Sequence, residues 1–290
     1  MSLKIAVLAK QVPDTRNVGK DAMTEEGTVN RAALPAIFNP EDLNALEMAL
    51  YIKDIVPQTE VYVLTMGPVR AAEIIRQSLY RGADGGFVIS DRKVAGSDTL
   101  ATSYTISQGV KKLCKVDLVF AGRQAIDGDT AQVGPQTAEK LNMPQITYAE
   151  EVICADEKKI RIKRRLERGV EEVECAYPCL ITVGSSAPDC RFPIAKQLMK
   201  YKNALTEAEA AEMKKDCSDM FSKKPYLKIG LWSAADIEAE DSRLGLSGSP
   251  TKVKKIDNVV LTAKESIEVE PTDEGLDNLV KDLIASHIIG

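Results

Sequence analysis

Residues 116–141 read VDLVFAGRQAIDGDTAQVGPQTAEKL and contain three kinds of segment in order. An apolar run at 116–121 is followed by a glycine-containing loop and then by an amphipathic segment at 130–141. A short, mostly apolar run without regular alternation is typical of a strand buried on both faces of a parallel sheet. The stretch therefore predicts a buried strand, a loop and a helix, which is the unit from which α/β proteins are built.

The same order of apolar run and amphipathic segment recurs through the preceding part of the chain. The helix that follows Asn39 has a strong start, because Asn39 is a favoured N-cap, Pro40 fits the first helical position, and acidic residues follow. Repeated alternation of strand and helix predicts a parallel sheet with helices on both faces. Strands are expected at 5–9, 61–65 and 87–90, and helices at 40–52, 71–82 and 98–113.

The pattern changes after Pro144. Alternating apolar and polar residues with short turns predict an antiparallel meander that extends the sheet, with strands at 146–155, 159–167 and 170–176. A further apolar strand is expected at 180–183, a loop at 184–202, and helices at 206–215 and 276–289. Because little core is visible after Lys228, we divide the chain into an α/β domain, 1–225, and a C-terminal arm, 226–290, that lies along another surface.

The composition fits an ordinary soluble globular protein, with 290 residues, 44% of them hydrophobic and 28% charged, and a net charge of -5. A net negative charge does not indicate the basic surface that nucleic-acid binding requires. The basic run at 158–168 is broken by Ile160, Ile162 and Leu166, which indicates a strand with one wet basic face rather than a polyanion site. No apolar run is long enough to span a bilayer and the N-terminus lacks a signal-peptide layout, so a cytoplasmic location is expected.

Residues needed for common catalytic sites are scarce. The single histidine, His287, lies three residues from the C-terminus. Chain ends tend to be poorly ordered, whereas catalysis by a nucleophile–histidine pair or by zinc requires an imidazole in a fixed position. The six cysteines contain no C-x-x-C pair, so an iron–sulfur cluster and a structural zinc site are disfavoured and buried free thiols are expected. We therefore predict no catalytic side chain and no metal centre of these kinds.

The loop from Arg123 to Gln136 has the features of a diphosphate-binding site. In parallel sheets, ligands bind beyond the carboxyl ends of the strands, where Ala9-Lys10, Met66-Gly67 and Ala121-Gly122-Arg123 are expected. Free N–H groups at a helix start attract anions, glycines allow close approach, and Arg123 adds a cation. The loop contains neither a G-x-G-x-x-G nor a P-loop motif, and a glycine-rich loop without a ligand remains the alternative.

Two carboxylates in this loop, Asp127 and Asp129, would repel a phosphate unless they point away or hold a cation. Asp129 and Gln132 have the spacing of a capping box. Asp127 is suited to accept a hydrogen bond from a ribose hydroxyl. A magnesium ion held by the pair is the alternative use of both.

The residues Gly122-Arg123-Gln124-Ala125-Ile126-Asp127-Gly128-Asp129, with Gln132 and Gly134, resemble the signature loop of electron-transfer flavoprotein beta subunits. Further matches lie in order along most of the chain, at 9–14, 39–42, 66–68, 82–84 and 191–200. The resemblance implies a Rossmann-like adenine-nucleotide-binding fold, with a parallel sheet, an antiparallel extension and a C-terminal arm, paired with an alpha subunit that holds a flavin. The arm would pack on that alpha subunit.

The resemblance also implies the ligand. Ordinary members hold AMP in the beta subunit as a structural ligand, whereas electron-bifurcating members hold a second FAD there. The order Asp127-Gly128-Asp129-Thr130-Ala131 is similar to the bifurcating version, and Gly128 would leave room for the longer ligand. FAD is therefore the expected cofactor and AMP the alternative.

The resemblance also implies which individual residues contact this ligand. For Met66 the alternative is core packing, and for Asn39 it is a helix cap. The adenine end would be framed by Ala9, Asn39, Asp42 and Met66, with Thr102 as a further contact. The diphosphate and ribose would be held by Arg123, Gln124, Asp127, Gly128, Asp129, Thr130, Ala131, Gln132, Val133, Gly134, Pro135 and Gln136.

By this resemblance the chain is a subunit of an NADH-oxidising complex, with no chemistry expected from the isolated chain. NADH would pass a hydride to the FAD of the beta subunit. One electron would go to ferredoxin or flavodoxin, and the other through the alpha-subunit FAD to an acyl-CoA-type dehydrogenase. A nucleotide-sensing domain without a redox role is a more distant alternative.

The dehydrogenase is expected to dock on the loop at 191–200. The anchoring leucine of mammalian-type members falls at Ala195 here, so Ile194 or Leu198 would take its place. Arg164 and Arg165 stand where ordinary members carry an acid near the flavin of the other subunit.

Overall fold

The computed structural model describes residues 2–14, 34–214, 216–251 and 268–289. Its main sheet has nine strands in the order β11-β5-β4-β1-β6-β10-β7-β8-β9. Neighbours from β11 to β7 are parallel, whereas β7, β8 and β9 form an antiparallel meander. The strands are β1 (Lys4–Leu8), β4 (Glu60–Met66), β5 (Gly85–Ile89), β6 (Leu118–Gly122), β7 (Gln145–Ala155), β8 (Lys159–Leu166), β9 (Gly169–Ala176), β10 (Cys179–Val183) and β11 (Gly230–Trp232).

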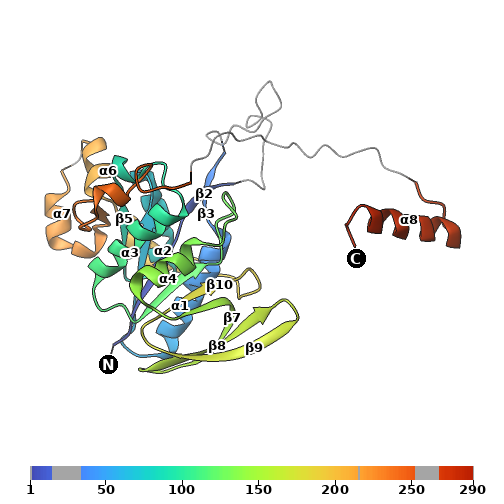
Figure 1. The fold of residues 1–290 in the computed structure, drawn as a ribbon. Helices are drawn as coiled ribbons and strands as arrows, with labels where there is room; N and C mark the ends of the chain where they lie inside the picture. The colour runs from blue at the N-terminus through green and yellow to red at the C-terminus, as the bar shows by residue number, and fades with distance from the viewer. Residues whose placement is uncertain (1, 15–33, 215, 252–267, 290) are drawn as a thin grey trace, which may run out of the picture.

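Helices cover both faces of this sheet, as Figure 1 shows. Residues of α1 and α2 pack with Val7 and Phe120 in one apolar cluster. Residues of α3 and α4 pack with Ala6 and Leu8 in a second cluster on the other face, because successive strand side chains point to opposite sides. The predicted α/β fold with a parallel sheet and an antiparallel extension is thus confirmed. The helices are α1 (Pro40–Ile55), α2 (Ala72–Arg81), α3 (Thr99–Leu113) and α4 (Val133–Leu141).

Several local predictions need correction. The segment 184–202, expected to be a loop, contains α5 (Ala195–Tyr201), and the segment 206–215 forms only a short helix, α6 (Glu207–Glu212). An unpredicted hairpin pairs β2 (Gln11–Pro13) with β3 (Ala36–Phe38). Helix α4 begins three residues later than expected, at Val133, because the backbone at Asp129 and Ala131 has a left-handed conformation with φ of 49° and 52°.

The expectation of little core after Lys228 is wrong for the residues that directly follow it. Strand β11 pairs with β5 at the edge of the sheet, and Trp232 stacks on Phe87 with ring centroids 4.0 Å apart. Ile229, Ala234, Ile237 and Leu244 are also buried. Residues 229–251 therefore pack on the α/β domain of this chain, and the division at residue 225 stays a prediction.

The last helix is α8 (Asp273–Ala285), which starts three residues before its predicted position. None of its residues is buried. Its sequence still follows an amphipathic pattern, with a row of exposed apolar side chains at Leu276, Leu279, Val280 and Ile284. Among the described residues, no helix is long and apolar enough to cross a membrane.

Most of the basic run at 158–168 lies in β8, and cations of this strand face acids on a neighbouring strand. Lys159 pairs with Glu174 at 3.0 Å, and Arg164 pairs with Glu171 at 3.2 Å. The prediction of a strand with a wet basic face is confirmed. The expectation of buried thiols holds for Cys179 and Cys217 but is wrong for Cys114 and Cys154, which are exposed.

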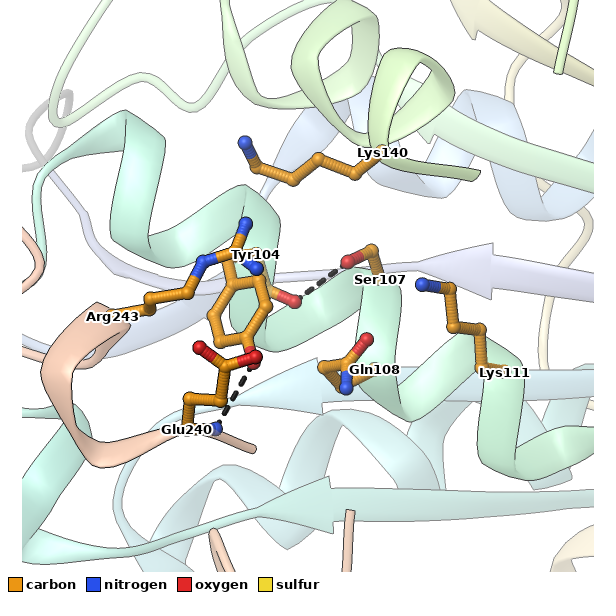
Figure 2. A pocket seen from close by; sticks show the side chains of 7 residues that line it. All are labelled: Tyr104, Ser107, Gln108, Lys111, Lys140, Glu240 and Arg243. Atoms are coloured by element: carbon orange, nitrogen blue, oxygen red, sulfur yellow. Dashed lines mark hydrogen bonds between the residues drawn. The ribbon is translucent and has the colours of Figure 1, made fainter. Parts of the chain in front are cut away.

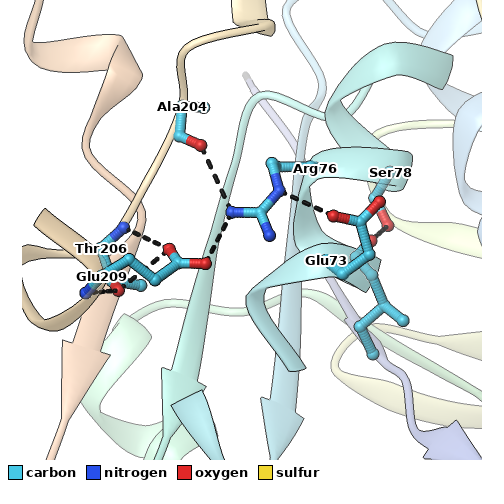
Figure 3. A network of polar contacts seen from close by, with 7 residues as sticks. Glu73, Arg76, Ser78, Ala204, Thr206 and Glu209 are labelled. Atoms are coloured by element: carbon cyan, nitrogen blue, oxygen red, sulfur yellow. Dashed lines mark hydrogen bonds and ion pairs between the residues drawn. The ribbon is translucent and has the colours of Figure 1, made fainter. Parts of the chain in front are cut away.

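A polar network attaches the segment after α5 to the helical layer (Figure 3). Arg76 on α2 donates to Glu209 on α6 at 2.9 Å and to Glu73 on its own helix at 2.9 Å. Its guanidinium also donates to the carbonyl of Ala204 at 3.4 Å. Glu209 and Thr206 form a capping box at the start of α6. One arginine thus fixes a short helix that has little intrinsic stability of its own.

Candidate nucleotide site

The carboxyl ends of β1, β4 and β6 meet at one edge of the sheet. Leu8 is in register with Leu64 on one side and with Ala121 on the other. The segments 9–10, 66–67 and 121–123 therefore lie together, where sequence reasoning placed them. Helix α1 begins at the same edge, after Asn39.

Asp42, in the first turn of α1, joins the ends of two strands. One carboxylate oxygen accepts from the N–H of Lys10 at 2.8 Å, and the other accepts from the N–H of Gly122 at 3.0 Å. A Cβ at position 122 would lie 2.4 Å from the Asp42 carboxylate, so only glycine allows this approach. Burial raises the pKa of Asp42 to about 7, although the two backbone N–H groups act in the opposite direction.

Asn39 shapes the loop rather than capping the helix. It occupies the predicted N-cap position of α1, but its side chain makes no cap hydrogen bond. Its amide nitrogen instead donates to the carbonyl of Gln124 at 2.9 Å, and its amide oxygen accepts from the N–H of Ile126 at 3.1 Å. Both ends of one side chain therefore fix the backbone of the loop after β6.

Arg123 stands at the mouth of β6 with its guanidinium partly committed. One terminal nitrogen pairs with Glu41 at 3.0 Å, and the guanidinium lies 5.8 Å from the ring centroid of Tyr148. Its Nε is buried and has no hydrogen-bond partner among the described residues. Buried donors are nearly always satisfied, so this N–H suits an acceptor oxygen of a ligand.

The two carboxylates of the loop are both used by the protein. Asp127 pairs with Lys10 at 2.7 Å. Asp129 accepts from the side-chain amide of Gln124 at 2.9 Å, so the expected capping box with Gln132 is wrong. These contacts reduce the repulsion that a phosphate would meet, and they give both acids a role that needs no magnesium ion. At Gly128 an added Cβ would meet nothing within 4 Å, so the position is open.

The first turns of α3 and α4 are tied together beside this loop. The hydroxyl of Thr99 donates to Gln132 at 2.8 Å, and the hydroxyl of Ser103 donates to Gln136 at 3.1 Å. Gly134 brings α4 close to the sheet, since a Cβ there would lie 2.6 Å from a methyl group of Thr182. Helix α4 has no side-chain cap; Pro135 has no N–H and the Gln136 N–H donates to the Gln132 carbonyl, so the N–H groups of Val133 and Gly134 are the ones left for a ligand.

The structure also places three further predicted residues, Met66, Ala9 and Thr102, whose contacts to a ligand stay a prediction. Met66 packs partly buried against two apolar clusters, as the core alternative expected. Ala9 is buried, and its N–H donates to Leu64. Thr102 lies in the first turn of α3, but Thr99 and Ser103 make the contacts to α4. The loop residues Thr130, Ala131, Val133 and Pro135 lie between these contacts, at the start of α4.

Tyr148 is a residue that the sequence did not single out. It lies in β7 with φ of 58°, a conformation that is rare for a bulky residue and is held at a cost of about 1–2 kcal/mol. Its N–H approaches the hydroxyl of Thr182 at 3.4 Å, beside a register shift in the pairing with β10. The strained backbone directs the half-exposed ring toward Arg123. No local motif marks such a position.

A second surface is formed by the loop at 191–200. Arg191 donates to both oxygens of Glu47 and also pairs with Asp54 at 2.8 Å, which fixes the loop on α1. The side chains beyond it are unusually exposed for apolar residues, with Phe192 at 89% and Met199 at 62%. The exposed apolar set is Phe192, Ile194, Leu198 and Met199, and it is flanked by Lys196 and Lys200.

Arg164 and Arg165, on the antiparallel extension, are held in ion pairs. Arg164 pairs with Glu171 and donates to the hydroxyl of Thr147 at 3.1 Å. Arg165 pairs with Glu150, whose pKa is lowered first by a hydrogen bond from Ser186 and then by this arginine. The fold thus places these two paired arginines close to Tyr148, whose ring faces Arg123.

The mostly parallel sheet with helices on both faces defines an α/β protein, a class in which ligands bind at the carboxyl edge of the sheet. A family model described as the electron transfer flavoprotein domain matches residues 26–214 of this chain. The match covers more than half of the sequence, and it includes α1 and the loop between β6 and α4. The chain belongs to the electron transfer flavoprotein family, and its relatives place it among the beta subunits of that family.

Similar proteins extend over the whole chain. One is the caffeyl-CoA reductase-Etf complex subunit CarD of Acetobacterium woodii, 42% identical over 99% of this chain and 100% of the relative. Another is the electron transfer flavoprotein subunit beta of Megasphaera elsdenii, 39% identical over 96% of this chain and 98% of the relative. A third is the acryloyl-CoA reductase electron transfer subunit gamma of Anaerotignum propionicum, 38% identical over 99% of this chain and 100% of the relative. The relatives are thus named as subunits of redox flavoprotein complexes.

The buried carboxyl of Asp42 predicts a pH dependence of stability. Its pKa of about 7 in the folded chain lies above the ordinary aspartate pKa of 3.8, so the folded chain binds this proton more tightly than the unfolded chain. The resulting contribution to the free energy of unfolding is complete below about pH 4 and is lost as the pH rises through about 7. Urea titrations at several pH values should show that the stability difference between wild type and Asp42→Asn shrinks across this range. A difference that does not change with pH would contradict the assignment.

The strain at Tyr148 predicts an unusual order of stability between two variants. Glycine adopts positive φ without penalty, so Tyr148→Gly should be about 1 kcal/mol more stable than Tyr148→Ala, the reverse of the usual order in a strand. Both variants lose the ring beneath Arg123 and should retain nucleotide equally poorly, whereas Tyr148→Phe should retain it. Thermal unfolding and nucleotide content measure the two effects. If alanine proves as stable as glycine, the backbone at this position is not strained.

Proposed function

We propose that this chain is the beta subunit of a heterodimeric, electron-bifurcating flavoprotein and holds FAD at the carboxyl edge of its sheet. In this proposal NADH is the hydride donor, and electrons pass to ferredoxin or flavodoxin and, through the flavin of the alpha subunit, to an acyl-CoA-type dehydrogenase. The observation that supports the proposal best is the loop at 121–136, whose carboxylates are paired within the protein, while the Nε of Arg123 has no partner among the described residues and the start of α4 has no side-chain cap.

The residues of this edge fit a dinucleotide diphosphate. The unpartnered Nε of Arg123 and the uncapped first turn of α4 supply donors for phosphate oxygens. Gly128 leaves open space beside them, which favours the longer FAD over AMP. When bound, FAD would supply hydride acceptance and one-electron transfer, while the side chains described above supply binding and orientation. No proton-transfer step is assigned to a side chain.

Two relatives support an acyl-CoA-linked role, since their names refer to caffeyl-CoA reductase and acryloyl-CoA reductase complexes. The surface suited to such a partner is the loop at 191–200, where Phe192 and Met199 are exposed beside lysines. An apolar anchor with a basic rim fits a docking site. Ala195 itself is small, so Ile194 or Leu198 would provide the anchor instead.

The exposed apolar row of α8 is assigned to the alpha subunit. A helix whose apolar face is not buried on its own chain is stabilised when it packs on another surface. In this proposal the part of the chain after residue 267 is the contact to the partner, while residues 229–251 belong to the domain.

Counting the nucleotides of the purified heterodimer tests the cofactor assignment. The proposal predicts two FAD for each heterodimer, because both subunits then hold a flavin. One FAD together with one AMP would establish the alternative, a non-bifurcating carrier with a structural nucleotide. A colourless preparation that binds adenine nucleotides as a monomer would instead indicate a nucleotide-sensing protein.

Replacing Arg123 tests where the diphosphate lies. Arg123→Ala removes a charge-assisted donor and should weaken nucleotide binding by about 1.5–3 kcal/mol, or roughly tenfold to a hundredfold. A matched control is Arg168→Ala, in the turn between β8 and β9, which should leave the affinity unchanged. Equilibrium titration of the nucleotide-depleted heterodimer measures both. Unchanged affinity in Arg123→Ala would place the diphosphate elsewhere.

A further inference from the structure

We call the carboxyl edge of the sheet, with the loop at 121–136, the nucleotide edge. A polar pocket lies apart from it, between α3, the end of α4 and the loop after β11. Figure 2 shows its side chains converging from these three segments. Its volume is about 250 Å³. It is lined by Tyr104, Ser107, Gln108, Lys111, Lys140, Glu240 and Arg243.

The charges of this pocket are not balanced. Lys111, Lys140 and Arg243 line it together with one carboxylate, Glu240, which leaves a formal excess of two positive charges. Among the residues that the structure describes, none of these three cations forms an ion pair, in contrast to the paired lysines at the nucleotide edge and on β8. Burial and the nearby charge of Arg243 lower the pKa of Lys140. A bound anion would relieve this repulsion.

The floor of the pocket is fixed by the fold. The Arg243 guanidinium lies over the ring of Tyr104 at 3.8 Å, and the Tyr104 hydroxyl accepts from the N–H of Glu240 at 3.0 Å. The hydroxyl of Ser107 donates to the carbonyl of Tyr104 at 2.7 Å. Tyr104 itself is buried. The loop that carries Arg243 is therefore held against α3 without a ligand, so little ordering would be needed for binding.

The lining favours a small anion over a protein partner. Protein interfaces have an apolar core, but the aromatic ring of this pocket is covered, and its other lining side chains are polar or charged. Arginine and lysine together suit phosphoryl oxygens, because the guanidinium donates in a fork and the ammonium adds a compact charge.

We propose that this pocket binds a small multivalent anion that carries phosphoryl groups, at a site separate from the nucleotide edge. The separation follows from the course of α3, which contacts the nucleotide loop through Thr99 and Ser103 and lines this pocket further along, from Tyr104 to Lys111. The proposal does not depend on which nucleotide occupies the edge.

Calorimetric titration of the nucleotide-loaded heterodimer with pyrophosphate, at low ionic strength, tests the site. Wild type should bind pyrophosphate more tightly than inorganic phosphate, because two phosphoryl groups meet more of the cations. Lys140→Gln and Lys111→Gln should each weaken pyrophosphate binding about tenfold. Lys112→Gln is the matched control, since Lys112 is next to Lys111 on α3 but donates to the carbonyl of Asp236, outside the lining.

Excess FAD, which is too large for a pocket of about 250 Å³, keeps the nucleotide edge occupied and should leave the affinity for pyrophosphate unchanged. Three results would overturn the proposal. They are an absence of pyrophosphate binding, an equal loss in Lys112→Gln and Lys140→Gln, which would indicate general surface charge, and displacement of pyrophosphate by excess FAD without a loss in Lys140→Gln. Melting temperatures of the variants confirm that each is folded.

Discussion

The carboxylate of Asp42 is the contact on which the ligand edge depends. It lies buried at the start of α1 and accepts one hydrogen bond from Lys10, two residues after β1, and another from Gly122, the last residue of β6. Two strand ends and one helix start are thereby fixed to each other. The contact is possible because position 122 is glycine, since a side chain there would overlap the carboxylate. The loop after β6 therefore starts at a position that these hydrogen bonds fix.

From that point the loop is built so that its own acids do not oppose an anion. Asn39 holds the loop backbone from both ends of its amide, Lys10 neutralises Asp127, and Gln124 occupies Asp129. The groups left without a partner are donors of positive character. They are the buried Nε–H of Arg123 and N–H groups at the uncapped start of α4. This balance of paired acids and unpaired donors would let a loop with two aspartates bind the diphosphate that we propose.

Periodicity predicted the sheet, its main helices and the edge where the loop lies, because these depend on local patterns of apolar residues. The loop residues were found from their glycines and Arg123. Strand β11 was missed because it is three residues long and is defined by pairing with β5, far away in sequence. Tyr148 gave no signal because its strain comes from the register of β7 against β10. The partners of Asp127 and Asp129 likewise required the fold.

We propose above all that the loop held by Asp42 binds the pyrophosphate of a flavin nucleotide. A crystal structure of the purified heterodimer measures this directly. We expect diphosphate density within hydrogen-bond distance of Arg123 Nε and of the N–H groups of Val133 and Gly134. A structure in which that turn packs against protein, with the nucleotide bound elsewhere or absent, would contradict it.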